Sequence, residues 1–234
     1  MGATKSWGAT QAPKTGGGNV NRADWRELGN NVQWRIRLFG GVLPNMIYWV
    51  KTRDGNRTRS ICNFNRETEQ FDSSIDDPIG KYVSPRDEKC RPQFNYVTKC
   101  IFRNPGARPD EVKVLELKQT VYNAIADLAK NPDWGDPTDD ENGYDLVIEK
   151  KKTGPLPQNV KYIVTPSRKN SPITPEERKM IEADGTNLAK LYKQDTPPEQ
   201  MAWLKENTDY LSMGGVGVAD TEGFNFDPNE DVPF

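Results

Sequence analysis

The chain has 234 residues, of which 34% are hydrophobic and 28% charged, and its formal net charge is −2. This length allows one domain with extensions or two small domains, and no apolar run is long enough for a membrane-spanning helix. The absence of histidine excludes catalysis by a Ser–His or Cys–His pair. Residues 1–22 lack the apolar segment of a signal peptide, so we expect a cytoplasmic protein.

The chain begins with an arm and then turns to strands. Residues 1–22 are rich in Gly, Thr, Lys and Asn, which predicts a flexible arm. Gln33 to Phe39 alternates polar and apolar residues and ends at Gly40-Gly41, and Met46 to Thr52 is rich in β-branched and aromatic residues. Asp54-Gly55 is a hairpin signal, so the segment that follows it, Arg57 to Phe64, is predicted to return beside the second strand.

The middle of the chain contains further strands and one helix. Residues 65–90 are polar and irregular, which indicates a long loop or a small insertion. The period of the apolar residues changes at Leu117, after which Val121, Ile125 and Leu128 recur at helical spacing. Further strands are expected at 93–103, 112–117, 144–150 and 160–165.

This order of elements favours a mainly β (α+β) domain over residues 23–170. In an OB-fold, a five-stranded Greek-key barrel, one helix lies between the third and fourth strands. The helix predicted at 118–130 has that position, and the strands before and after it supply the barrel. We therefore predict an OB-fold with one inter-strand helix.

Residues 171–206 are predicted to form C-terminal helices. Thr174 and Thr196 are each followed three residues later by glutamate, with proline directly after the threonine, which is typical of a capping box. We expect these helices to pack on the barrel or to contact a neighbouring molecule.

Charge is distributed unevenly along the chain. Residues 207–234 contain six acidic residues and no Lys or Arg, so the 32 basic residues of positions 1–206 outnumber the 28 acids there by four. The body is therefore basic, and the glycine-rich segment 207–234 is predicted to be a disordered acidic tail.

Basic and aromatic residues alternate on the first strands, between Gln33 and Ser60. Single-stranded nucleic acid requires this mixture, because cations neutralise phosphates and aromatic rings stack on bases. The alternative is that the rings fill the core and the arginines form a solvated face. The candidate DNA contacts are Trp34, Arg35, Arg37, Tyr48, Trp49, Lys51, Arg53, Arg57, Arg59, Tyr96 and Lys99.

Two other groups of residues suggest metal chemistry only weakly. The carboxylates of residues 136–141 are adjacent in a Gly/Pro loop, and a solvated loop is the simpler interpretation. Cys62, Cys90 and Cys100 are widely spaced and include no Cys-x-x-Cys pair, so we expect reduced, partly buried thiols. We predict neither a metal nor a cofactor.

The tail suggests a partner-binding segment. An acidic segment on a basic body can compete with DNA for the body's cationic groove, and it can offer carboxylates and Phe234 to a protein with an apolar pocket and a basic rim. The tail residues that we expect to bind a partner are Asp227, Glu230, Asp231, Val232, Pro233 and Phe234.

The ending Asp231-Val232-Pro233-Phe234 resembles the tail of bacterial single-stranded DNA-binding proteins. A separate part of the chain, covering roughly residues 90–175, resembles single-stranded DNA-binding proteins of tailed bacteriophages, which are OB-fold proteins. The segments that carry this second resemblance are Arg91 to Arg103 (RPQFNYVTKCIFR), Val112 to Asp139, Tyr144 to Gly154 (YDLVIEKKKTG) and Tyr162 to Thr174.

The resemblance implies a non-enzymatic protein that coats single-stranded DNA during phage DNA replication, recombination and repair, in the host cytoplasm. It also implies that the tail recruits replication proteins such as a polymerase, helicase or primase, and self-association on DNA is a further expectation. Many of the phage proteins carry a zinc ribbon, but Cys62 to Cys90 contains no paired ligands, which implies that zinc has been lost here.

Three alternatives stay open at this stage. One is a regulatory protein that binds a polymerase mainly through the acidic tail. The second is a metal-dependent nuclease that uses the carboxylates of residues 136–141. The third is a virion structural protein, which would form large assemblies without DNA.

Overall fold

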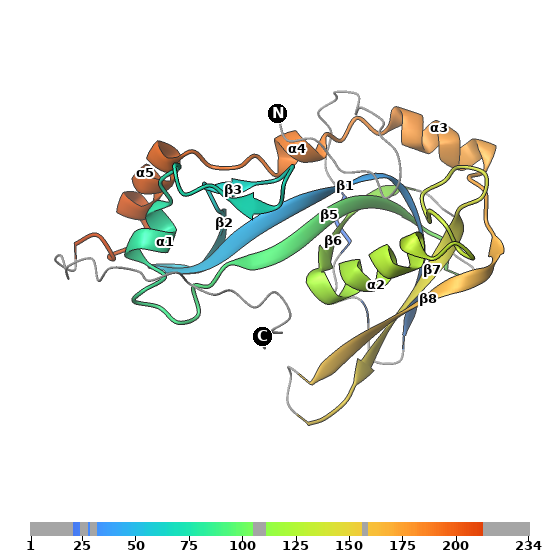
Figure 1. The fold of residues 1–234 in the computed structure, drawn as a ribbon, viewed down its shortest axis with the longest axis horizontal. Helices are drawn as coiled ribbons and strands as arrows, with labels where there is room; N and C mark the ends of the chain where they lie inside the picture. The colour runs from blue at the N-terminus through green and yellow to red at the C-terminus, as the bar shows by residue number, and fades with distance from the viewer. Residues whose placement is uncertain (1–20, 24–27, 29–31, 105–110, 156–158, 213–234) are drawn as a thin grey trace.

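The structure, a computed structural model, describes residues 21–23, 28, 32–104, 111–155 and 159–212. The N-terminal arm up to residue 20 and the tail from residue 213 lie outside the described residues. The fold is mainly β, as predicted, with helices between and after the strands (Figure 1). In chain order the elements are β1 (Gln33–Thr52), β2 (Gly55–Ser60), β3 (Phe64–Asn65), β4 (Gln70–Phe71), α1 (Pro78–Tyr82), β5 (Gln93–Phe102), β6 (Val112–Lys118), α2 (Gln119–Lys130), β7 (Tyr144–Lys152), β8 (Val160–Asn170), α3 (Pro175–Ala183), α4 (Leu188–Leu191) and α5 (Pro197–Asn207).

The main sheet is antiparallel and has the strand order β6-β5-β1-β7-β8, with β2 added to β1. Among the five strands of that path, α2 follows the third and precedes the fourth, which confirms the predicted place of the helix. Helix α2 contacts β5, β6 and β8, and thus connects the two outer strands of the path. This arrangement is consistent with an OB-like barrel-type fold.

The first strand is longer than the sequence suggests. Two strands were expected, separated by Gly40-Gly41, but β1 runs through both glycines without ending. Gly40 has a φ of +67°, which glycine adopts readily, and the register of β1 against β5 shifts between Phe39 and Leu43. The glycines therefore mark a β-bulge, which re-aims a single strand rather than terminating it.

The barrel core lies between the main sheet and α2. Val121 and Ile125 on the apolar face of α2 are buried against a cluster that includes Ile36, Leu115 and Leu117. This confirms the helical spacing seen in the sequence. Full burial of each aliphatic side chain contributes about 1.5–3 kcal/mol, so this shared face is the main reason that α2 stays on the sheet.

The predicted insertion forms part of a second core. Residues 65–90 contain the end of the β3–β4 hairpin and α1, and α1 packs against α5. Both helices lie at one end of β1, away from α2 (Figure 1). The second cluster joins Met46, Tyr48 and Val50 of β1 to residues of β3, α1, α5 and the segments beside them, namely Ile61, Phe64, Ile79, Val83, Cys90 and Leu204.

The C-terminal helices begin where the sequence predicts. Thr174 and Thr196 both form complete capping boxes, in which the side chains of Glu177 and Glu199 accept from the backbone N–H of the cap threonine. The four-residue helix α4 was not predicted, and its main local signal is a cap by Asn187, whose side chain accepts from the backbone N–H of Lys190. The described part of the chain contains no helix that is long and apolar enough to cross a membrane.

All three cysteines are buried free thiols, and burial raises the pKa of each to about 12. We expect a thiol reagent at pH 8 to leave Cys62, Cys90 and Cys100 unmodified in the folded protein and to modify all three in denaturant. Buried thiols are protected because the reagent cannot reach them and because only a small fraction is present as the reactive thiolate. Counting the modified thiols by mass spectrometry checks this, and rapid modification of any one thiol in the folded chain would contradict it.

Candidate nucleic-acid interface

Three of the aromatic residues considered as DNA contacts lie in the two cores. Trp34, Tyr48 and Tyr96 are 5%, 4% and 4% exposed. Trp34 packs edge-on against Phe102 with ring centroids 5.1 Å apart, and the Tyr48 hydroxyl donates to Asp77 Oδ2 at 2.8 Å. Burial raises the pKa of both tyrosines. Burial of all three rings favours the alternative interpretation, in which they fill the cores, over a role in stacking on bases.

Arg37 is also an interior residue, not part of a basic surface. Its side chain is fully buried and donates to the backbone carbonyls of Leu38, Pro137, Asp139 and Ser171. Burial, together with the nearby Arg103, lowers the pKa of this guanidinium. Arg37 therefore holds the loop before β7 against β1, and strand alternation alone could not reveal a basic residue satisfied by carbonyls.

Three further basic candidates are held by the C-terminal segment. Arg53 donates to Asp209 at 2.9 Å and to two backbone carbonyls at the end of α5. Arg59 pairs with Asp195 at 2.5 Å and lies over the Trp203 ring, and Lys99 pairs with Asp184 at 2.8 Å. These cations connect the sheet to the segment that follows it, which the sequence could not show.

The remaining candidates lie on the surface. Trp49 is 40% exposed, and the alternation of β1 places it on the face opposite to buried Tyr48. Lys51 is exposed on the face that Trp49 occupies. Arg57 is also exposed, but it pairs with Val50 across the hairpin and so lies on the other face of the sheet. Arg35 is partly exposed and pairs with Asp145 at 3.5 Å. An exposed ring beside an exposed cation is what base stacking and phosphate neutralisation require.

A lysine-rich hairpin was missed by the sequence reasoning. Lys151 and Lys161 are paired across β7 and β8 and are exposed, with exposed Lys152 and half-buried Lys150 beside them. The hairpin projects beyond the rest of the sheet (Figure 1). One exposed pair at 3.7 Å, between Lys151 and Glu149, offsets little of this charge. The signal in the sequence is the KKK run of YDLVIEKKKTG.

The acidic loop has a structural use for its carboxylates. Asp136 accepts from the backbone N–H and hydroxyl of Thr138, and Asp139 accepts from the backbone of Glu141 and Asn142. Asp140 pairs with Arg178 of α3 at 2.7 Å. These contacts are those of a turn-rich loop tied to a helix.

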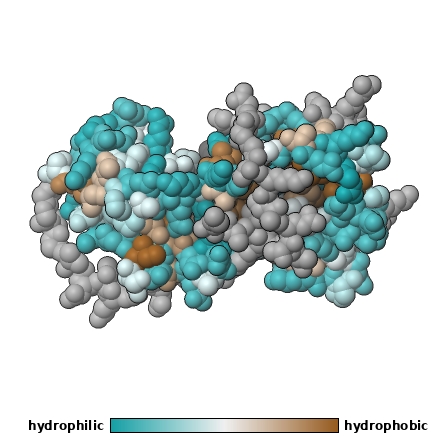
Figure 2. All heavy atoms as spheres, turned by 90° about the horizontal axis from the view of Figure 1, so that it is seen from above, coloured by the Kyte–Doolittle hydropathy of each residue, from teal (hydrophilic) through white to brown (hydrophobic). Residues whose placement is uncertain are grey.

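The exposed surface is polar over much of its area. Figure 2 shows one face that is mainly hydrophilic, with hydrophobic residues in small separate patches. Where described residues form that face, charge and isolated aromatic rings are therefore the features on which recognition can be built. The acidic tail residues lie outside the described residues, so their predicted role stays a prediction.

Comparison with known proteins finds a phage relative. No protein-family model matches the chain. A protein of Escherichia phage T5, named as a probable ssDNA-binding protein, is 31% identical over 159 residues. The match covers 64% of this chain and 56% of the phage protein, so the chain spans little more than half the length of its relative. The chain is thus similar to a phage protein named for single-stranded DNA binding, as the sequence resemblance indicated.

Proposed function

We propose that this chain binds single-stranded DNA without sequence preference, coats it, and carries out no catalysis. The observation that carries the proposal is the 31% identity to the phage T5 protein named as a probable ssDNA-binding protein. The OB-like sheet supports it, because such barrels bind oligonucleotides on one face and in the adjoining loops. Exposed Trp49 and the lysines of the β7–β8 hairpin supply the chemistry that such binding uses.

The proposed contacts are a subset of those predicted from the sequence, with the hairpin lysines added. Trp49 would stack on a base, and Lys51 on the same face of β1 would neutralise a phosphate. Arg57, on the other face of the edge strand β2, and Arg35, at the far end of β1, would neutralise phosphates further along the bound strand. Because phosphate contacts release counterions, binding should weaken steeply as salt rises. The proposal is tested by titrating a labelled oligo(dT), oligo(dA) and a duplex with the full chain, where clear binding of both single strands and weak binding of the duplex is the expected result.

Replacing Trp49 with alanine should weaken oligo(dT) binding by about 1–3 kcal/mol, the usual contribution of one stacking ring. Trp49 is 40% exposed and belongs to neither buried core, so its loss should destabilise the fold less than loss of a core ring. Fluorescence anisotropy measures the change, and Phe71→Ala is the matched control, since Phe71 is an exposed ring (46%) on β4 outside the proposed interface. Equal affinities of Trp49→Ala and the wild type would remove Trp49 from the interface.

We further propose that the chain acts in phage DNA replication, recombination and repair and that residues 227–234 recruit a replication protein. The sequence of this segment, acidic residues followed by Val-Pro-Phe, supports that role through the resemblance already described. A synthetic peptide of residues 220–234 should compete with the full chain for a polymerase, helicase or primase of the same replication system. If the full chain binds such a partner but not DNA, the regulatory alternative takes the place of DNA coating.

A further inference from the structure

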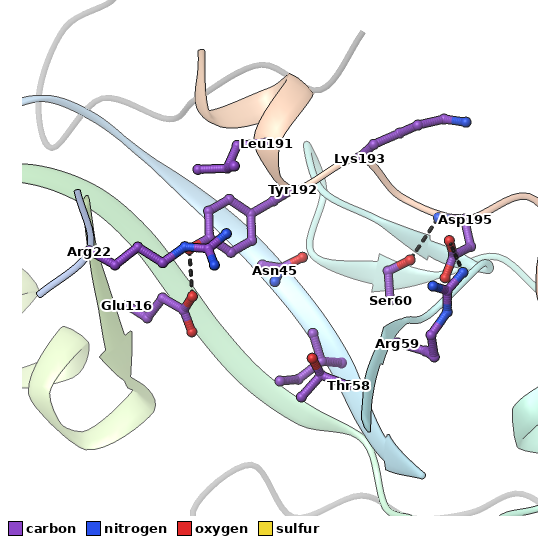
Figure 3. A pocket seen from close by; sticks show the side chains of 11 residues that line it. Arg22, Asn45, Thr58, Arg59, Ser60, Glu116, Leu191, Tyr192, Lys193 and Asp195 are labelled. Atoms are coloured by element: carbon purple, nitrogen blue, oxygen red, sulfur yellow. Dashed lines mark hydrogen bonds and ion pairs between the residues drawn. The ribbon is translucent and has the colours of Figure 1, made fainter. Parts of the chain in front are cut away.

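A polar pocket of about 240 Å³ lies between the β1–β2 strands and the segment that follows α4 (Figure 3). Ile47 and Thr58 line it, and the register of the hairpin places both on the face of the sheet that also carries Trp49. In Figure 3 the Asn45 side chain lies in the middle of this pocket, between Tyr192 and Thr58. The pocket therefore continues the surface on which base stacking by Trp49 is proposed.

A buried arginine fixes the orientation of the Asn45 amide. Arg66 is 7% exposed and donates to Asn45 Oδ1 at 2.7 Å. A guanidinium can only donate, so the amide oxygen must face it, and the amide nitrogen is the polar atom left for other partners. The structure gives Asn45 Nδ2 no partner among the described residues. The pocket thus presents a positioned hydrogen-bond donor.

The surroundings of Asn45 carry unbalanced positive charge. Arg66 has no carboxylate partner among the described residues, and its Nε is buried without a hydrogen bond, as is the Nε of Arg59 in the pocket wall. The two acids that line the pocket, Glu116 and Asp195, are already engaged by Tyr192, Asn95 and Arg59. An uncompensated buried cation is costly, and a negatively charged or electron-rich ligand offsets that cost.

We infer that this pocket takes one unstacked nucleotide of the bound strand, whose base presents a keto oxygen to Asn45 Nδ2. Arg22, which also lines the pocket and lies over the Tyr192 ring, can attract an adjoining phosphate, whereas Lys193 points away from Asn45 and pairs with Glu199 at 2.6 Å. A keto oxygen is found on thymine, guanine and cytosine, whereas adenine presents an amino group in its place. The inference rests on the proposed function, since it assumes that a single strand crosses this face.

The test is an Asn45→Asp variant of the full chain, titrated with labelled oligo(dT) and oligo(dA). The new carboxylate pairs with Arg66, so the melting temperature should not fall. It cannot donate to a keto oxygen, but it can accept from the amino group of adenine. We expect the Kd for oligo(dT) to rise by up to about tenfold, the loss expected for one hydrogen bond to a base, and the Kd for oligo(dA) to change much less.

Two further variants complete the test. Asn123→Asp adds the same charge at an exposed position of α2, away from the pocket, and should shift both affinities slightly and equally. Thr58→Glu places a carboxylate in the pocket from an exposed strand position, and should weaken binding of both oligonucleotides well beyond the control, even if Asn45→Asp does not fold. If all three variants show the same affinities for oligo(dT) and oligo(dA) while the wild type binds both, the inference about the pocket is overturned and the proposed function stands. Failure of the wild type to bind either oligonucleotide overturns the proposed function.

Discussion

Replacing Arg103 with alanine is expected to lower the free energy of unfolding by about 3–5 kcal/mol, because it leaves buried Glu177 without its cation and buried Asp145 with only the more distant Arg35. Arg103 donates to Asp145 at 2.8 Å and to both oxygens of Glu177, and the three side chains are 14%, 6% and 2% exposed. It also donates to the carbonyls of Ser171 and Pro172. One arginine therefore joins β5, β7 and the start of α3.

Urea denaturation of the variant and the wild type measures this effect. Arg178→Ala is the matched control, since Arg178 on α3 also pairs with an aspartate, Asp140, but both groups are about half exposed. An exposed pair contributes only about 0–1 kcal/mol, so this variant should unfold almost as the wild type does. Similar midpoints for the two alanine variants would contradict the role given to Arg103.

The same site predicts how stability depends on pH. Burial alone would raise the pKa of Glu177, but hydrogen bonds from Arg103 and Thr174 bring it below its ordinary value. A carboxyl with a lowered pKa stabilises the fold above its unfolded pKa of about 4 and loses that contribution as the pH falls. The stability difference between wild type and Arg103→Ala should therefore shrink below about pH 4.

Replacing Lys150, Lys151 and Lys152 with glutamine is expected to have the largest effect on DNA binding. If each lysine neutralises one phosphate, the slope of log K against log salt should become shallower by about 2. At 0.1 M monovalent salt this corresponds to about 100-fold weaker binding. The strand should nevertheless form, because Lys151 and Lys152 are exposed and the strand register depends on the backbone.

Titrations of oligo(dT) at several salt concentrations measure the slope. Glutamine at Lys81, Lys89 and Lys130, three exposed lysines elsewhere on the molecule, removes the same charge and controls for the net change. That control should lower the affinity modestly. An unchanged slope in the hairpin variant would place the DNA on another surface.

Local patterns predicted most of the elements. The 3.6-residue period of Val121 and Ile125, the Asp54-Gly55 turn and the two capping boxes each encode their element within a few residues, and each is present in the structure. The continuous β1 was not predicted, because a glycine pair is equally compatible with a strand end and with a bulge. Only the pairing of both halves of β1 with β5 decides between them.

The candidate interface was harder to predict, because exposure depends on contacts between distant residues. Composition identified a basic and aromatic segment, but Arg37 and Arg53 are held by carbonyls at least 100 residues away in the chain. Alternation does place Trp49 opposite Tyr48, though it could not say which ring is covered by the second core. The lysine run of β7 is present in the sequence, but only the pairing of β7 with β8 shows that these lysines lie on a projecting hairpin beside Lys161.

The most direct test of the proposed function is an anisotropy titration of labelled oligo(dT) with the full chain at 50 and 200 mM salt. A truncated chain that ends after Ser212, titrated in parallel, keeps the residues that Arg53 and Arg86 hold. Binding by both chains, about 100-fold weaker at the higher salt and tighter for the shorter chain, is the predicted result. Absence of binding by both, or binding that does not respond to salt, would contradict single-stranded DNA coating by this protein.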